Sequence, residues 1–248
     1  MQFFVPDIRL ASELGAQTSQ QDKFGGLPWG LESRLWPKCS ECGKSQSFLA
    51  QLLHDPVRFN LGRQGRMLYV FQCNHDPGMC ATWEGGSGAN ACFIVEPEDV
   101  TERLSECPSD GPLVENEVRV VRWVEREDGI PASLVPSFYD NDKLNALVAE
   151  GVHKVPSSTK LASVPHWIQS PTEAPQEPGW KFVGQIDSVH SFLQAPTQSA
   201  SWVYPDKEQW EGRTHCGQSF NFGDGGIAYL FVRDTDSRPK GWFFWQCG

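Results

Sequence analysis

Three short motifs occur twice in this chain of 248 residues, in the same order in each half. The pairs are KFGGLPWG at 23–30 with KLASVPHW at 160–167, FLAQL at 48–52 with FVGQI at 182–186, and GRMLYVFQ at 65–72 with GIAYLFV at 226–232. A tryptophan follows the last motif in each half, Trp83 in the first and Trp242 or Trp245 in the second. The repeat predicts two related halves that arose by internal duplication, residues 1–130 and 131–248. The alternative is coincidence among three short matches, and two copies are too few for a solenoid.

The spacing of the motifs predicts an insertion in the second half. Gln51 and Tyr69 are 18 residues apart, whereas Gln185 and Tyr229 are 44 residues apart. The second half therefore has about 26 additional residues, which we place near 190–222.

Short apolar runs rich in β-branched and aromatic residues predict strands at 68–72, 118–124, 227–232 and 241–245. Glycine-rich turns are expected at 85–88 and 223–226. Two helices are expected, one over 97–107, which opens with proline and acids, and one over 141–150, which Gly151 ends. Five prolines within 151–180 predict an extended loop. The fold class is therefore α+β and β-rich.

Four of the eight cysteines form two pairs. Cys39 and Cys42 belong to a CxxCG motif, in which Gly43 lets the backbone turn, and Cys73 and Cys80 follow a predicted strand. Two such pairs from separate loops are the usual source of four thiolates for structural Zn²⁺. The gap in the second pair is wide, so His75 is an alternative ligand. Two other interpretations of these cysteines are reduced thiols without a metal and a disulfide.

The second half has no cysteines at the matching positions, so a zinc ion would stabilise one half only. Four thiolates also leave no open position for water, which argues against a catalytic zinc.

Negative charge is concentrated in one segment. The formal net charge is −10, and residues 96–128 contain 11 acids and 4 bases. Such a surface repels nucleic acid and attracts a basic partner. The alternative is an ordinary solvated helix and hairpin. The candidate partner-binding residues are Glu96, Glu98, Asp99, Glu102, Glu106, Glu115 and Glu117.

Sequence motifs of enzymes are absent. The glycine loops complete no dinucleotide or phosphate-binding motif, and neither GxSxG nor HExxH occurs. The histidines at 54, 153, 166 and 190 stand singly near predicted loops, where surface or hydrogen-bonded roles are usual. We expect no catalytic residues and no enzyme activity. No apolar run could span a bilayer, and the amino-terminal residues do not resemble a signal peptide, so a cytoplasmic location is expected.

The motifs KFGGLPW at 23–29, WPKCSECG at 36–43 and FLAQL at 48–52, followed by LYVFQC at 68–73, resemble the YwqG-like bacterial family. The same order is more distantly similar to the programmed cell death protein 2 family, where the cysteines look metal-binding. The resemblance includes the closing segment from Gly223 and is weakest over 96–155. It implies an internally duplicated β-rich α+β fold without an established enzymatic activity.

Some members of this family resemble immunity proteins that neutralise nuclease toxins delivered by type VI secretion. The resemblance therefore implies an immunity protein for a cognate, basic toxin. The alternative is a cytoplasmic adaptor or assembly factor of the same fold, and an enzyme is the remaining reading.

Overall fold

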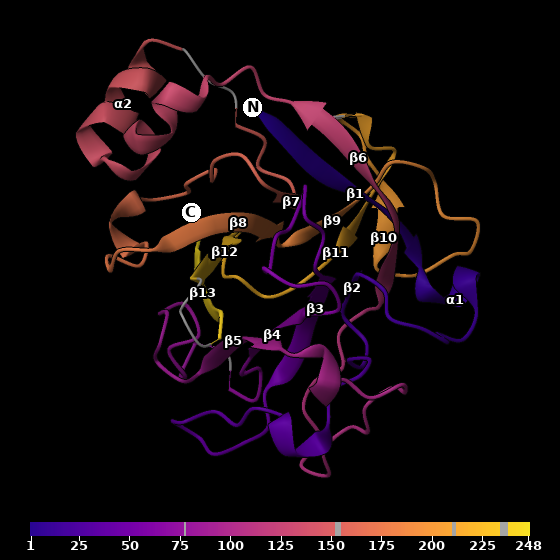
Figure 1. Ribbon diagram of the computed structural model, residues 1–248. Helices are drawn as coiled ribbons and strands as arrows, with labels where there is room; N and C mark the ends of the chain where they lie inside the picture. The colour runs from indigo at the N-terminus through magenta and orange to yellow at the C-terminus, as the bar shows by residue number, and fades with distance from the viewer. Residues whose placement is uncertain (77, 152–154, 210–211, 234–237) are drawn as a thin grey trace.

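The computed structural model describes residues 1–76, 78–151, 155–209, 212–233 and 238–248. Most of the described strands form one ten-stranded antiparallel sheet, in the order β13-β12-β8-β7-β1-β6-β2-β3-β4-β5 (Figure 1). The strands are β1 (Gln2–Leu10), β2 (Lys23–Phe24), β3 (Ser47–Leu53), β4 (Met67–Gln72), β5 (Asn90–Val95), β6 (Val118–Glu127), β7 (Lys160–Leu161), β8 (Trp180–Asp187), β12 (Ile227–Arg233) and β13 (Lys240–Gln246).

A smaller sheet, in the order β10-β11-β9, lies where the second half is longer than the first. Its strands are β9 (Val189–Phe192), β10 (Val203–Pro205) and β11 (His215–Gln218). The helices are α1 (Ala11–Leu14) and α2 (Asn141–Ala149), and the 3-10 segments are η1 (Ser33–Leu35), η2 (Pro97–Asp99), η3 (Ala132–Tyr139) and η4 (Pro171–Glu173).

The large sheet curves until its two edge strands lie close together. β13 contacts β5, and Gly241 is so near β5 that a Cβ at this position would be 2.8 Å from the carbonyl oxygen of Cys92. The Trp242 ring lies directly against Gly85 in the loop before β5. The sheet is therefore nearly closed, and the absence of a side chain at Gly241 allows the close approach.

We call β2, β3, β4 and β5 the first arm of the sheet, and β7, β8, β12 and β13 its second arm. The curved sheet encloses one apolar core to which both arms contribute. Leu49 and Val70 come from the first arm, and Ile186, Leu230 and Phe243 come from the second. Two further clusters cover the outer faces of the arms, one around Tyr69 and Phe71 and the other around Tyr229 and Phe231.

Strand order is symmetric about the central β1–β6 pair. Outward from β6 lie β2, β3, β4 and β5, and outward from β1 lie β7, β8, β12 and β13. Gln51 pairs with Tyr69 across β3 and β4, and Gln185 pairs with Tyr229 across β8 and β12. The residues that match in sequence therefore occupy matching positions in the sheet.

Hydrogen bonds of the buried polar residues also match between the arms. The Gln51 Oε1 atom accepts the backbone N–H of Trp29 at 2.7 Å, and the Gln185 Oε1 atom accepts that of His166 at 2.9 Å. The hydroxyls of Tyr69 and Tyr229 donate to the carbonyl oxygens of the same two residues, Trp29 and His166.

The buried lysines of the two motifs also form equivalent bonds. The Lys23 ammonium donates to the Leu27 carbonyl at 2.8 Å, and that of Lys160 donates to the Val164 carbonyl at 2.7 Å. These bonds satisfy polar groups that would otherwise be costly to bury.

Several sequence-based predictions are confirmed. Strands occur over all four predicted runs, and α2 occupies the predicted helix 141–150, where the Asp140 carboxylate accepts the Lys143 backbone N–H as an N-cap. The region 151–180 is largely irregular, apart from β7, the start of β8 and η4, and its residues 152–154 lie outside the described residues.

Two predictions are wrong. The helix expected over 97–107 is limited to η2, because the following backbone pairs with residues 28–30 instead of with itself. Gly30 donates to the Arg103 carbonyl, Thr101 donates to the Gly30 carbonyl, and Ser105 donates to the Pro28 carbonyl. Trp83 does not match Trp242 or Trp245, because it lies in the loop before β5 and packs against Trp245.

Candidate metal centre and acidic surface

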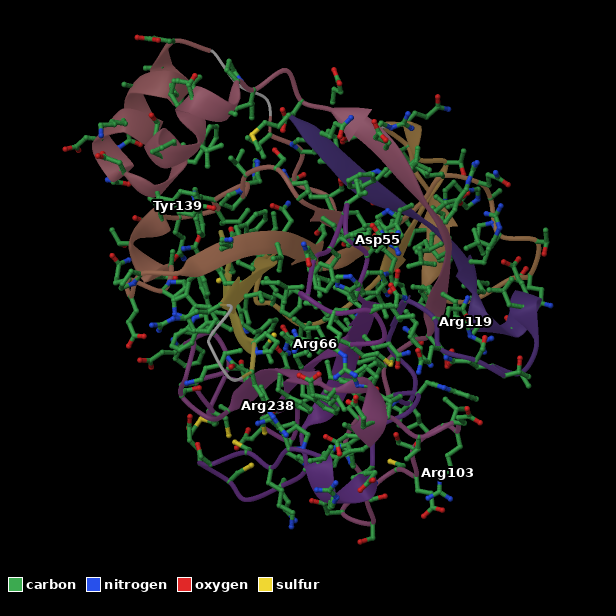
Figure 2. All side chains as sticks on the ribbon, viewed as in Figure 1. Asp55, Arg66, Arg103, Arg119, Tyr139 and Arg238 are labelled. Atoms are coloured by element: carbon green, nitrogen blue, oxygen red, sulfur yellow. The ribbon has the colours of Figure 1, made fainter. Side chains whose placement is uncertain are left out.

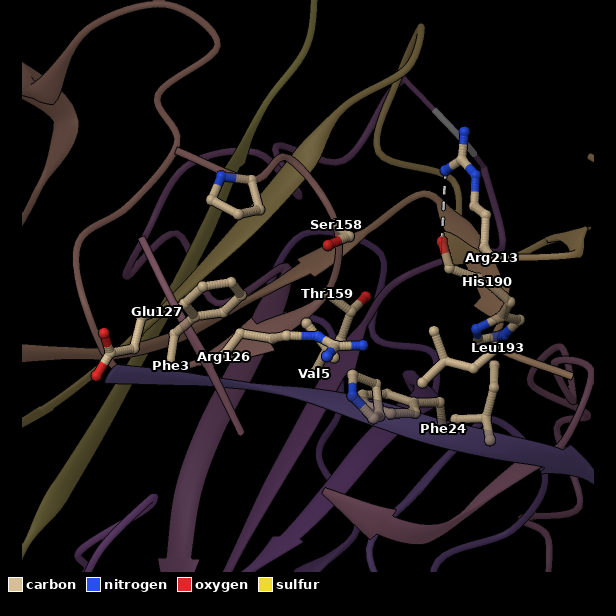
Figure 3. Close-up of a pocket in the computed structure, with 14 residues that line it drawn as sticks. Phe3, Val5, Phe24, Arg126, Glu127, Ser158, Thr159, His190, Leu193 and Arg213 are labelled. Atoms are coloured by element: carbon tan, nitrogen blue, oxygen red, sulfur yellow. Dashed lines mark hydrogen bonds between the residues drawn. The ribbon is translucent and has the colours of Figure 1, made fainter. Parts of the chain in front are cut away.

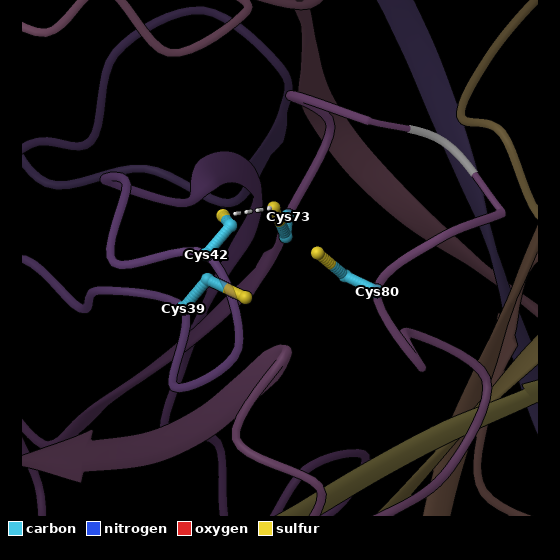
Figure 4. A group of neighbouring side chains, drawn as sticks. All are labelled: Cys39, Cys42, Cys73 and Cys80. Atoms are coloured by element: carbon cyan, nitrogen blue, oxygen red, sulfur yellow. Dashed lines mark hydrogen bonds between the residues drawn. The ribbon is translucent and has the colours of Figure 1, made fainter.

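Four cysteines from two loops meet at one point (Figure 4). Cys39 and Cys42 lie on the turn between η1 and β3, Cys73 directly follows β4, and Cys80 lies in the loop before β5. Their sulfur atoms all lie within 4.8 Å of one another, and those of Cys42 and Cys73 are 3.5 Å apart. Four sulfurs at 2.3 Å from a tetrahedral Zn²⁺ would be about 3.8 Å apart, so the arrangement fits this ion.

The first cysteine pair lies on a tight turn held by backbone hydrogen bonds. The Cys39 N–H donates to the Lys44 carbonyl at 2.8 Å, and the Gly43 N–H donates to the Cys39 carbonyl at 2.9 Å. Gly43 has a φ of 74°, a conformation that most other residues adopt at a cost. The sequence CxxCG therefore orients both thiols toward one point.

Backbone amides also contact the sulfur atoms. The amide of Lys44 hydrogen-bonds to the Cys42 sulfur and lowers the pKa of this thiol. Burial raises the pKa of Cys73 to about 11, although the amide of His75 opposes the shift, and burial also raises the pKa of Cys80. The buried thiols would be protonated on their own, and a divalent cation is the group that would stabilise them as thiolates.

His75 is not part of the thiol cluster. Its Nε2 atom lies 3.1 Å from the Ser45 carbonyl oxygen, so the imidazole is engaged outside the site. All eight cysteines are unpaired, and the 3.5 Å between the closest cluster sulfurs is much longer than the about 2.05 Å of a disulfide. The four cysteines are therefore the ligand set that the structure brings together.

The acidic residues differ in their surroundings. Glu96 pairs with Arg66 at 3.0 Å and with Arg63 at 3.5 Å, and Glu98 also pairs with Arg63. Glu98, Glu102 and Glu106 are exposed, whereas Glu96, Asp99, Glu115 and Glu117 are half-buried. Arginines from an earlier part of the chain, such as Arg66, therefore neutralise part of the charge, and Arg103 adds a positive charge to the segment itself (Figure 2).

Glu115 and Glu117 are only two residues apart but have opposite environments. Glu117 accepts from the buried Lys23 ammonium at 2.9 Å and from Arg119 at 2.8 Å. Burial raises the pKa of Glu115 to about 7, and the neutral side-chain amide of Asn74 donates to its carboxylate at 2.8 Å.

A cavity that the sequence did not predict lies beside β1. Its volume is about 230 Å³, and His190 lies in its wall. His190 is 4% exposed, and its Nε2 atom has no hydrogen-bond partner among the described residues, so the surface or hydrogen-bonded role expected for it is wrong. No local signal marks this site, because β1 and β9 are about 180 residues apart in the chain.

None of the helices within the described ranges is long and apolar enough to cross a membrane. No protein-family model matches the chain, and no curated protein matches it.

Proposed function

We propose that this chain is a zinc-stabilised binding protein that docks a basic partner protein through residues 96–117, here called the acidic segment. Its partner is a nuclease-type toxin delivered by type VI secretion, which the chain neutralises as an immunity protein. The two loops that contain the cysteines, between η1 and β3 and between β4 and β5, are here called the metal loops. The observation that carries the proposal is an exposed acidic segment that also presents apolar side chains and is hydrogen-bonded to the metal loops.

Acids and apolar side chains are exposed together along this segment. Glu102 and Glu106 are exposed and pair with no described residue. Leu113 is 55% exposed, Val114 is 50% exposed and Leu104 is 39% exposed. Apolar contacts surrounded by charge are typical of protein interfaces, in which the buried apolar part supplies affinity and the charges speed association.

The metal loops hold the acidic segment at two points. The Ser45 N–H, three residues after Cys42, donates to the Asp110 carboxylate at 2.7 Å. The Asn74 amide, next to Cys73, donates to the Glu115 carboxylate at 2.8 Å. A zinc ion that fixes Cys42 and Cys73 would therefore also fix the surface that the partner contacts.

The matching strand order and hydrogen bonds support an origin of the two halves by internal duplication. Eight unpaired cysteines support a reducing, cytoplasmic location.

The test is to purify candidate toxins encoded by neighbouring genes and to measure their association with this chain, by stopped flow or surface plasmon resonance, at several salt concentrations. We expect a one-to-one complex whose association slows as salt rises. The triple variant Glu98→Gln, Glu102→Gln and Glu106→Gln should associate roughly tenfold more slowly at low salt.

The matched control is the triple variant Glu150→Gln, Glu208→Gln and Asp224→Asn, which removes the same charge from exposed positions outside residues 96–128. It should associate nearly as fast as the unmodified chain. Equal slowing in both triple variants would contradict docking through the acidic segment. Capture of host assembly factors in place of any toxin would favour the adaptor function instead.

A further inference from the structure

The cavity beside β1 lies between the two sheets (Figure 3). Its walls come from β1, the end of β6, the turn before β7, and β9 of the small sheet. A volume of about 230 Å³ is far above the 10–15 Å³ that one water molecule needs, so the cavity can hold a small organic molecule.

Most of the cavity wall is apolar. Phe3, Ile8 and Phe24 are buried side chains that line it, and Leu193 also lines it. An apolar ring or chain would therefore be favourably desolvated here.

Two residues that line this apolar space each have a buried polar atom without a partner among the described residues. The Nε2 atom of His190 and the Oγ atom of Ser158 have no hydrogen bond to any described residue, and the two residues are 4% and 5% exposed. Both residues line the cavity. Buried polar atoms are normally satisfied, so two orphans at one cavity indicate a missing hydrogen-bonding group.

The environment of His190 keeps its imidazole neutral. Its ring lies among the rings of Phe24, Trp202 and Phe220, at centroid distances of 6.2, 6.0 and 5.6 Å. Burial lowers the pKa of His190 to about 3. Neutral imidazole offers a donor at one nitrogen and an acceptor at the other, so it suits a hydroxyl group better than an ion.

A positive charge lies at the edge of the cavity. Arg126 is exposed, lines the cavity and forms no ion pair with a described residue. Figure 3 shows its side chain extending from beside Phe3 toward Thr159. The other arginine of the wall, Arg213, is paired with Asp206, so Arg126 is the guanidinium free to bind an anion.

We propose that this cavity binds a small hydroxyaryl monocarboxylate. The ring contacts Phe3, Ile8 and Phe24, the hydroxyl hydrogen-bonds with the His190 imidazole, and the carboxylate pairs with Arg126. Glu127, which also lines the cavity, disfavours ligands with a second negative charge. This ligand is independent of the basic partner protein proposed above.

The experiment is a titration of the folded chain with three probes, in which isothermal calorimetry measures the affinity and amide NMR shifts locate the binding site. Hydroxyphenylpropionate has both polar groups, phenylpropionate lacks the hydroxyl, and hydroxyphenylpropanol lacks the charge. We expect the first to bind, each of the others to bind about tenfold more weakly, and the shifts to map to β1 and β9.

Exposed arginines provide the matched variants. Arg126→Gln should weaken hydroxyphenylpropionate about tenfold and leave hydroxyphenylpropanol unchanged, and Arg103→Gln should change neither. The proposal is overturned if no probe binds at millimolar concentration, if the shifts lie elsewhere, or if both arginine variants have the same effect. Both variants are at exposed positions, so folding does not obscure the result.

Discussion

Glu115 provides a test in which removal of a charge should stabilise the protein. Its carboxylate is half-buried, accepts from the neutral Asn74 amide, and has a pKa raised by burial from 4.5 to about 7. Glu115→Gln keeps the oxygen that accepts this bond and removes the ionisable group. We therefore expect the variant to be more stable than the unmodified chain above neutral pH.

The magnitude follows from the shift in pKa. A shift of about 2.5 units corresponds to about 3 kcal/mol in the free energy of unfolding, at 1.36 kcal/mol per unit. Because the side chain is only partly buried, solvent reduces this value, and we expect a gain of roughly 1–2 kcal/mol at pH 8.

The sign depends on pH in a defined way. Below pH 4.5 the carboxyl is protonated in the folded and unfolded chains, so it has no destabilising effect. As the pH rises from 4.5 to about 7, the unfolded chain ionises first, and the folded chain loses stability relative to it. The advantage of Glu115→Gln should therefore be small at pH 5, grow toward pH 7 and be constant above.

Urea unfolding at pH 5, 6, 7 and 8, followed by tryptophan fluorescence, measures this difference. Glu117→Gln is the control, because Glu117 pairs with the fully buried Lys23 ammonium and its loss should cost about 2 kcal/mol. The reasoning is refuted if Glu115→Gln is no more stable at pH 8, or if its advantage does not shrink at pH 5.

Three further predictions concern the repeat, the closure of the sheet and the metal. Gln51→Ala and Gln185→Ala should each lower the free energy of unfolding by about 2–4 kcal/mol in urea titrations, because each leaves a buried N–H unpaired and opens a cavity. Gly241→Ala should cost about 1–3 kcal/mol in the same assay, since its Cβ would be 2.8 Å from the Cys92 carbonyl oxygen, whereas Gly248→Ala should cost little. Elemental analysis should find about one zinc per chain, reduced in Cys80→Ser but not in Cys107→Ser, which alters an exposed cysteine outside the cluster.

Local features of the sequence predicted local structure well. The strands follow from short apolar runs, and α2 ends shortly before Gly151, as the sequence predicts. The cysteine spacing identified all four members of the thiol cluster. The matching motifs also contain Gln51 and Gln185, but their burial is a finding of the structure, because glutamine is usually exposed.

Contacts between distant parts of the chain explain the errors. Residues 97–107 begin like a helix, but their backbone groups pair with residues 28–30, a choice that no local propensity reveals. The charge count over the acidic segment could not show that Arg63 and Arg66 pair with Glu96. The cavity at His190 likewise forms where β1 packs against β9 of the small sheet, and no local feature of the sequence reveals this contact.

The two arms of the sheet cover their matching tyrosines, Tyr69 and Tyr229, in different ways, and only the first arm has the cysteine cluster beside it. In the second arm, Trp167 follows His166 and lies on Tyr229, with ring centroids 4.6 Å apart. The matching position in the first arm is Gly30, which has no ring to place on Tyr69. Long loops cover this face instead, and Trp36 from one of them packs on Phe71.

Ordering long irregular loops costs more conformational entropy than ordering the single aromatic side chain that covers Tyr229 in the second arm. A zinc ion that joins Cys39 and Cys42 to Cys73 and Cys80 would offset this cost in the first arm alone. Chelation should therefore speed amide exchange over 37–46 and 78–89 while leaving 227–233 protected, as measured by hydrogen-exchange mass spectrometry. The contact between the Trp167 and Tyr229 rings does not involve the loops that contain the cysteines. Equal loss of protection in both arms would therefore show that the cysteines support the whole fold.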